Sequence, residues 1–375
     1  MHSPAGARGQ TKSLPFVQDT GDLEYRLTML INTLTEREKK KIVFVGGHGE
    51  KPASEMTALR SQLQSQFTVE DVALTGRTTL PQDAAAVVVA GPTQALPAAA
   101  KRALQEYLAD GGAGLFLLDG VQPDLQNMMG RENGSGALDL LANVGVMVNP
   151  DIVYDLRSHE TVQMGSSFQM LLVPYPFWIT AQPASSSPVT SRLEHVVLPW
   201  GSSIAVSDPV AAAAGYTIVP LLQTSDAAGA AAPTSPLDPR VNFPQEGLSK
   251  QTVAVALQGS TPVDASSAMK PKGRIVVTGD SDFLTDRMVS NNATSLAFAL
   301  NALSWMTEQE SLGDIQVKQR AAPRLVFSSI GQQSMLQYGN LILAAGLPIL
   351  LGLSRLLRRR KLGKFTFETL RQRGV

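Results

Sequence analysis

The sequence predicts an α/β fold in which helices flank both faces of a parallel sheet. Its 375 residues and 43% hydrophobic content are enough for a sizeable buried core. Three short apolar runs, at residues 42–45, 86–90 and 115–118, have the composition of strands buried on both faces. Amphipathic helical patterns at residues 54–66 and 97–110 separate these runs. Strands that alternate with helices in this way form parallel sheets covered on both sides.

Residues 1–150 are expected to form the first part of this α/β domain. An amphipathic helix begins at Asp22, because apolar side chains recur at helical spacing at Leu23, Leu27, Leu30, Ile31 and Leu34. Residues 67–74 are predicted to be extended. Pro97 suits the first turn of a later helix, and Gly112 stands where that helix should end.

Residues 151–270 are expected to form an insertion of mixed β character. Its strand-like pieces, separated by turns rich in proline and serine, lie at residues 152–156, 170–173, 196–198 and 203–206. Residues 225–239 contain mainly alanine, proline and serine, and too few large apolar side chains to pack, which predicts a mobile loop. Residues 271–307 then complete the α/β domain with a strand at 274–278 and a helix at 291–307.

The charges are divided unevenly along the chain. Although the formal net charge is zero, residues 336–375 hold eight Lys or Arg against the single Glu368, a net charge of +7. The preceding 335 residues therefore carry a net charge of −7. An acidic body argues against a nucleic-acid partner, which would require a basic stripe across the folded part. The absence of cysteine excludes disulfides, thiolate nucleophiles and cysteine metal ligands.

The strongest single signal is an apolar segment near the C-terminus. Residues 325–354 contain no charged side chain, and the last 20 of them, residues 335–354, are mostly Leu, Ile, Ala and Gly. A helix of that length spans about 30 Å, which is the thickness of the hydrocarbon core of a bilayer. We therefore expect a connector at residues 308–334 and then a transmembrane helix rather than a buried core helix. The apolar anchor residues are Leu341, Ile342, Leu343, Leu347, Ile349, Leu350 and Leu351.

A basic tail at residues 355–375 follows the apolar segment and sets the expected orientation. Its first cluster consists of Arg355, Arg358, Arg359, Arg360 and Lys361. The positive-inside rule places such a cluster in the cytoplasm, beside anionic lipid head groups. We therefore expect an inner-membrane protein with an extracytoplasmic body. Because residues 1–18 contain no signal-peptide core, this topology is expected to need a further N-terminal anchor missing from this sequence; the alternative is a tail-anchored protein with a cytoplasmic body.

The first candidate ligand-binding turn is Gly46-Gly47-His48-Gly49-Glu50, between a predicted strand and a predicted helix. Its backbone amides can face an anion at the carboxyl edge of the sheet, with His48 and Glu50 as ligand-binding side chains. Its spacing matches no established phosphate-binding motif, so a tight turn with a solvated His48–Glu50 pair is the alternative.

The second candidate turn is Gly279-Asp280-Ser281-Asp282-Phe283, again at the end of a strand. Carboxylates two residues apart can hold a metal or act as acid and base, but the chain has only four histidines to add ligands. The alternative is that Asp280 or Asp282 caps the next turn or helix. We expect neither a metal nor a cofactor.

No catalytic nucleophile is evident in the sequence. No serine stands in a G-x-S-x-G turn, and there is no cysteine. The apolar cluster Pro174-Tyr175-Pro176-Phe177-Trp178 predicts either an exposed contact surface or an internal packing corner.

These segments, taken in order, resemble the GldG family, the auxiliary components of ABC transport systems first associated with gliding motility. The resemblance is carried by Leu23-Glu24-Tyr25 with the helix to Leu34, residues 42–50, Tyr175-Pro176-Phe177-Trp178, Leu198-Pro199-Trp200-Gly201-Ser202-Ser203, Gly279-Asp280-Ser281-Asp282-Phe283, residues 301–305, and the terminal apolar segment with Arg358-Arg359-Arg360. It covers most of the chain. Each motif alone is weak, and the specificity lies in their shared order.

The resemblance implies a fold similar to that of class I glutamine amidotransferases, of the flavodoxin-like kind, without their catalytic cysteine. It also implies a non-enzymatic partner of an ABC permease and its ATPase, held outside the cytoplasm. Members of such a family usually begin with an N-terminal membrane anchor, whereas this chain resembles the family from a later point.

The sequence therefore favours a non-catalytic, membrane-anchored auxiliary subunit of an ABC transport system. Its extracytoplasmic body is expected to bind a partner or substrate at the carboxyl edge of the sheet. One alternative is a membrane-bound hydrolase or transferase with His48, Glu50, Asp280 and Asp282 around one cleft. Another is a structural envelope protein without a transporter.

Overall fold

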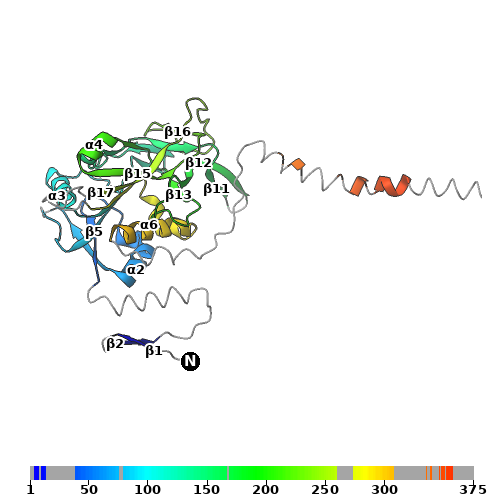
Figure 1. Cartoon of the computed structure of the whole chain (residues 1–375). Helices are drawn as coiled ribbons and strands as arrows, with labels where there is room; N and C mark the ends of the chain where they lie inside the picture. The colour runs from blue at the N-terminus through cyan, green and yellow to red at the C-terminus, as the bar shows by residue number, and fades with distance from the viewer. Residues whose placement is uncertain are drawn as a thin grey trace, which may run out of the picture. The chain divides into compact units, whose positions relative to one another are not determined.

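The computed structural model describes residues 4–7, 10–13, 39–75, 79–166, 169–259 and 273–307, together with short helical pieces between residues 335 and 357 (Figure 1). The chain divides into two compact units, Met1–Gln319 and Arg320–Val375. The helix predicted from Asp22 and the connector predicted at residues 308–334 lie outside the described residues. Near the N-terminus, β1 (Pro4–Ala7) and β2 (Gln10–Ser13) pair in an antiparallel hairpin.

Among the described residues, ten strands form the main sheet, and five of them make its parallel part. Those five, in spatial order, are β4 (Thr68–Ala73), β3 (Lys41–Gly46), β5 (Ala84–Ala90), β6 (Gly114–Leu117) and β18 (Ile275–Thr278). Numbered along the chain, this is the order 2-1-3-4-5 of flavodoxin-like folds. The predicted α/β class is confirmed, and four of these strands lie within two residues of the predicted boundaries while β4 matches the stretch predicted to be extended.

The rest of the main sheet is antiparallel and makes the whole sheet mixed. Next to β18 come β17 (Thr252–Gly259), β15 (Tyr216–Gln223), β12 (Gln169–Pro183) and β11 (His159–Ser166), with β13 (Val196–Pro199) also paired to β12. The segment predicted as an insertion therefore extends the same sheet with antiparallel strands. Sequence reasoning did not predict β15 and β17, although residues 253–257 of β17 are all buried.

Alternate residues of the parallel strands enter two cores on opposite faces of the sheet. Ile42 and Phe44 pack into the core that contains α2 (Thr57–Gln66) and α6 (Ala293–Met306). Val43 and Val45 pack into the core that contains α3 (Ala98–Ala109) and Ala211 of α4 (Asp208–Ala213). Figure 1 shows α2 and α6 together on one side of the body and α3 on another. Each such side chain contributes roughly 1.5–3 kcal/mol when fully buried.

The remaining described elements are three two-stranded ladders and several short helical turns. The two-stranded ladders are β7 (Val121–Asp124) with β8 (Met129–Glu132), β9 (Val146–Val148) with β14 (Ile204–Val206), and β10 (Ile152–Asp155) with β16 (Ala228–Ala231). The short helical turns are η1 (Ala53–Glu55), η2 (Ala142–Val144), η3 (Asp282–Leu284) and α5 (Asp286–Val289).

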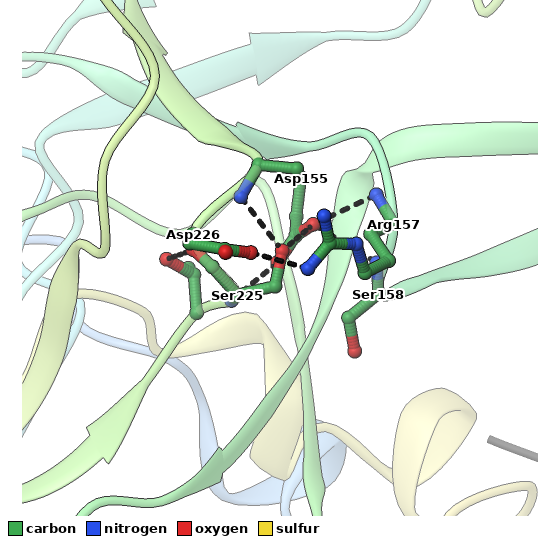
Figure 2. Close-up of polar contacts among 7 residues, drawn as sticks. Asp155, Arg157, Ser158, Ser225 and Asp226 are labelled. Carbon is green, nitrogen blue, oxygen red and sulfur yellow. Dashed lines mark hydrogen bonds and ion pairs between the residues drawn. The ribbon is translucent and has the colours of Figure 1, made fainter. Parts of the chain in front are cut away.

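Residues 225–239, expected as a mobile loop, include strand β16 and the fully buried Leu237. The buried carboxylate of Asp155 accepts hydrogen bonds from the backbone N–H and the hydroxyl of Ser225, both at 2.7 Å (Figure 2). It also accepts the backbone N–H groups of Arg157 and Ser158, both at 2.9 Å. Local composition did not predict this order because the partner that fixes Ser225 is 70 residues away in the sequence.

Only separate pieces of the transmembrane helix predicted at residues 335–354 are described. Within the described part of the chain, no helix has both the length and the apolar character needed to cross a membrane.

Gly279 provides a test of how the sheet edge is closed. A Cβ atom on Gly279 would lie 2.0 Å from the carbonyl oxygen of Ser202, which is far inside van der Waals contact with rigid backbone. We predict that Gly279→Ala lowers the free energy of unfolding by about 1–3 kcal/mol or more, as overpacked sites do. The measurement is urea unfolding of the purified protein, followed by circular dichroism.

Gly134→Ala is the matched control for this substitution. No described heavy atom lies within 4 Å of a Cβ placed on Gly134, so this variant should unfold within about 0.5 kcal/mol of the parent. Equal stability of the two variants would contradict the close packing of Gly279 on Ser202.

Candidate functional site

Three turns that follow parallel strands meet at the carboxyl edge of the sheet. Gly91 directly follows β5 with a φ of +61°, and its N–H donates to the carbonyl of Leu117 in β6 at 2.8 Å. A Cβ atom on Gly91 would lie 2.3 Å from Oγ of Ser281 and 2.7 Å from Oδ2 of Asp119. Only glycine therefore allows the turn after β5 to approach the turns after β6 and β18 this closely.

The turn at residues 200–203 docks onto the same edge from the antiparallel part of the chain. The N–H of Ser202 donates to the carbonyl of Gly279 at 2.7 Å, and the N–H of Gly120 donates to Oγ of Ser202 at 3.0 Å. Asp151 holds the next residue, because its carboxylate accepts the N–H and the hydroxyl of Ser203 at 2.8 and 2.5 Å. The segment Leu198–Ser203, one of those that carried the family resemblance, therefore holds the ends of β6 and β18 together through the hydrogen bonds of Ser202.

A polar cluster made of Lys51, Asp119, Asp280, Ser281 and Asp282 occupies the turn after β18 and its neighbours. Oδ1 and Oδ2 of Asp119 accept the N–H and the hydroxyl of Ser281, both at 2.6 Å. Oδ1 of Asp280 accepts the N–H of Asp282 at 2.7 Å. The ammonium of Lys51 forms an ion pair with Asp282, across 231 positions of sequence.

Burial and mutual repulsion perturb the acids of this cluster. Burial, followed by the negative charge of Asp282, raises the pKa of Asp119 to about 6. Burial, together with the charges of Asp282 and Asp119, holds the pKa of Asp280 well above its usual range. Burial disfavours the Lys51 ammonium, but the charges of Asp282 and Asp119 outweigh burial and raise the pKa of Lys51. Lys51 thus keeps its ammonium charge, in contact with Asp282, beside the carboxyl groups of Asp119 and Asp280, which hold their protons more tightly than usual.

A cleft of about 530 Å³ opens beside this cluster. That volume lies in the range of small-molecule sites in proteins. Its lining combines charged groups, hydroxyl and amide groups, and apolar side chains that include two indoles. The lining residues are Lys51, Ser54, Glu55, Thr93, Asp119, Val121, Gln122, Pro123, Leu125, Trp178, Trp200, Asp282, Thr285, Asp286, Arg287 and Met288.

The two indoles of the cleft are held in a fixed arrangement. The rings of Trp178 and Trp200 are perpendicular, at 87°, with centroids 5.6 Å apart. Trp200 has a φ of +55°, which is rare for a bulky side chain and persists only where the surroundings fix it. Its indole N–H donates to the hydroxyl of Tyr175 at 2.9 Å, and its backbone N–H donates to the carbonyl of Phe177 at 2.8 Å.

The aromatic cluster predicted from residues 174–178 therefore divides between two roles. Tyr175 and Phe177 are 4% and 1% exposed and form part of an internal aromatic core, whereas Trp178 lines the cleft.

Of the four predicted ligand-binding residues, Asp282 lines the cleft and the other three do not. The pair His48 and Glu50 forms a tight turn, in which Oε2 of Glu50 accepts the backbone N–H of His48 at 2.7 Å. The side chains of this pair are each 4% exposed, so the pair is buried where the sequence suggested a solvated one. Asp280 is 2% exposed and caps the start of η3 through the N–H of Asp282.

The described residues contain no group of three or more His, Cys, Asp or Glu arranged to hold a metal ion. The hydrolase or transferase alternative required His48, Glu50, Asp280 and Asp282 around one cleft. The structure does not bring these four side chains together around this cleft; of the four, Asp282 lines it.

Several cleft residues were missed by sequence reasoning. Asp119 directly follows the apolar run at residues 115–118, much as Asp280 follows the strand at residues 275–278. The pattern of an acidic residue after a buried strand, which drew attention to Asp280, would therefore also have identified Asp119. Lys51 directly follows the predicted turn at residues 46–50, and nothing in the surrounding sequence marks it as a binding residue. Trp178 and Trp200 were noted as motif residues, but sequence alone does not show which aromatic of a cluster faces a cavity.

The raised pKa of Asp119 predicts a pH dependence of stability. Because the folded protein binds this proton more tightly than the unfolded chain, the contribution of Asp119 to stability is fully present below about pH 4 and is lost as pH rises through about 6. Asp119→Asn does not titrate, so the parent should lose on the order of 1–3 kcal/mol relative to this variant between pH 4 and 7. Chemical unfolding at four pH values measures this difference.

Glu106→Gln, on the exposed face of α3, is the control for the loss of one carboxylate. Its stability difference from the parent should change little over the same pH range. A flat difference for Asp119→Asn as well would show that Asp119 ionises normally in the folded protein.

Comparison with known proteins finds one matching family and several similar structures. The sequence model of a family described as an ABC-type uncharacterized transport system matches residues 39–309. No curated protein matches the sequence significantly.

Similar solved structures include the mmIFT52 N-terminal domain, with 17% identity and a TM-score of 0.48, covering 71% of this chain and 97% of that one. A protein described as a GMP synthase component from Thermoplasma acidophilum has 10% identity and a TM-score of 0.35, covering 74% and 100% of the two chains. A ThuA-like protein from Parabacteroides merdae has 10% identity and a TM-score of 0.37, covering 76% and 93%.

Proposed function

We propose that this chain, which belongs to the auxiliary family of ABC-type transport systems, is a membrane-anchored, non-catalytic subunit of such a transporter. Its α/β body binds a substrate or partner in the cleft at the carboxyl edge of the sheet. An ABC permease and its ATPase are the proposed partners, and the GldG family is the proposed subgroup because of the motifs that resemble it.

The observation that carries this proposal is the place of the cleft within the family match. Every lining residue of the cleft, from Lys51 to Met288, falls inside the matched residues 39–309. The cleft also lies outside the carboxyl ends of parallel strands, where doubly wound α/β proteins bind their ligands. A family match that spans both the sheet and this cleft supports binding as the role of the body.

The interactions inside the cleft favour binding over catalysis. Asp119 is engaged by Ser281, and Lys51 is engaged by Asp282. Asp286 accepts the N–H groups of Thr57 and Ala58 at 3.0 and 2.8 Å, which caps α2. A general acid or base needs a free position towards its substrate, whereas these carboxylates are committed to the chain itself.

The proposed anchor is the uncharged segment at residues 335–354, and the basic tail at residues 355–375 is proposed to face the cytoplasm. The tail adds roughly 1 kcal/mol of membrane attraction for each basic residue near an anionic surface. This orientation places the body outside the cytoplasm. It also leaves the apolar helix available for contact with a permease.

Co-purification from native membranes tests this function. A tag on the chromosomally encoded protein allows extraction in mild detergent and identification of bound subunits by mass spectrometry. We predict recovery of one permease and one ATPase, and loss of both when residues 335–375 are deleted. A variant with Glu106→Gln, on the exposed face of α3, should recover both and controls for handling.

If the intact chain recovers neither subunit from membranes in which it is abundant, the transporter assignment is wrong. If the deleted chain recovers both as efficiently as the intact chain, the proposed anchor is not the docking element.

A further inference from the structure

Carboxylates of the chain itself already accept backbone amides at three places near the carboxyl edge of the sheet: the turn after β3, the start of α2 and the turn after β18. Oε2 of Glu50 accepts the N–H of His48 in the turn after β3, at 2.7 Å. The carboxylate of Asp286 covers the start of α2, and that of Asp119 accepts the N–H of Ser281. In flavodoxin-like folds such amides bind phosphate groups. Here a phosphate would have to displace an internal carboxylate at each position.

The charges that line the cleft also disfavour an anionic ligand. Four carboxyl groups, those of Glu55, Asp119, Asp282 and Asp286, stand against the two basic groups of Lys51 and Arg287. Lys51 is already paired with Asp282. An approaching phosphate or carboxylate would therefore meet more carboxylates than cations; of the two cations, Lys51 is paired and Arg287 lies at the exposed surface.

The rest of the lining suits a ligand with an apolar face and several hydroxyl groups. The indoles of Trp178 and Trp200 line the cleft, and the electron-rich face of an indole ring attracts polarised C–H groups. Ser54, Thr93 and Gln122 add polar groups to the lining. Oγ1 of Thr93 donates to the carbonyl of Gly49, and Nε2 of Gln122 donates to the carbonyl of Thr93 and to Oδ1 of Asn133, so the side-chain oxygens of Thr93 and Gln122 remain as acceptors for ligand hydroxyls. The ring of a sugar combines these two properties, with C–H groups on one face and hydroxyls at its edge.

The position of Trp200 indicates that this arrangement is built into the fold. Its left-handed backbone is maintained by hydrogen bonds to Tyr175 and Phe177, and Tyr175 in turn donates to the carbonyl of Leu237 at 2.7 Å. Such backbone strain costs on the order of 1–3 kcal/mol and clusters at ligand-binding sites. Rigid aromatic side chains lose little conformational entropy on binding.

We propose that the cleft binds an uncharged saccharide, with a sugar ring against Trp178 and Trp200 and its hydroxyls directed to Gln122 and the polar groups around Asp282. This inference rests on the proposed binding role of the body and names the class of its ligand. It excludes nucleotides and other phosphorylated compounds as ligands of this cleft.

Tryptophan fluorescence of the full chain provides the test. Two of the three tryptophans line the cleft, and the third, Trp305, lies in α6. The probes are the neutral trisaccharides N,N′,N″-triacetylchitotriose, cellotriose and maltotriose, with glucose 6-phosphate and ATP as anionic comparators. The protein is kept in a zwitterionic detergent, because detergents with sugar head groups would compete for the cleft.

We predict that at least one neutral trisaccharide changes the fluorescence saturably and that neither anionic comparator does. Trp178→Ala and Gln122→Ala should each weaken binding of that sugar by about tenfold, measured by calorimetry. Trp305→Phe, outside the cleft, should bind it as the parent does. Circular dichroism of each variant confirms that it is folded before binding is compared.

Saturable binding of ATP or glucose 6-phosphate in the cleft, or no response to any of the three sugars, would overturn the proposal. Equal affinity of the parent and a folded Trp178→Ala variant would overturn it as well. Co-purification of the transporter subunits with the Trp178→Ala variant distinguishes failure of this proposal from failure of the proposed function. If the subunits are recovered while no sugar binds, the ligand class is wrong and the transporter assignment stands.

Discussion

The docking of Ser202 onto Gly120 and Gly279 is the constraint on which the rest of the site depends. It joins the turn after β13 to the ends of β6 and β18, through hydrogen bonds of 2.7 and 3.0 Å. Glycine is required at position 279 because a side chain there would meet the backbone of Ser202. This docking also fixes the neighbouring Trp200 beside the cleft. A local packing requirement in the sheet therefore positions an aromatic group that is far away in sequence from both β6 and β18.

Electrostatics adds a second constraint at the same edge. Buried carboxylates are tolerated here because backbone N–H groups and hydroxyls satisfy them, as with Asp119 and Ser281. These hydrogen bonds use backbone N–H groups of the kind with which many α/β proteins bind phosphate. The internal carboxylates therefore occupy amides that would otherwise be available to an anionic ligand.

The sequence predicted the parallel sheet well because its signals are local. Buried strands such as β3 and β5 are continuous apolar runs, and α3 and α6 show helical spacing. The antiparallel half was harder to predict. β12 continues through three prolines, and the order of residues 225–239 depends on the distant Asp155.

Prediction of the site had a similar limit. The turns after β3 and β18 were recognised as sites where functional groups gather, and Asp282 does line the cleft. His48 was a reasonable candidate by residue type, yet its turn is closed by Glu50. Which side chain of a turn faces a cavity is decided by packing from other elements, here by Ser281 on Asp119 and by Tyr175 on Trp200.

We propose that the cleft beside Trp178 and Trp200 is the surface through which the body binds its substrate or partner. Hydroxyl-radical footprinting in native membranes tests it without knowledge of the ligand. The oxidation of each tryptophan is compared between cells with the complete transport system, supplied with their natural substrates, and washed membranes that hold this chain alone. The account predicts slower oxidation of Trp178 and Trp200 in the complete system and an unchanged rate for Trp305. Equal rates for all three tryptophans, or protection of Trp305 alone, would contradict it.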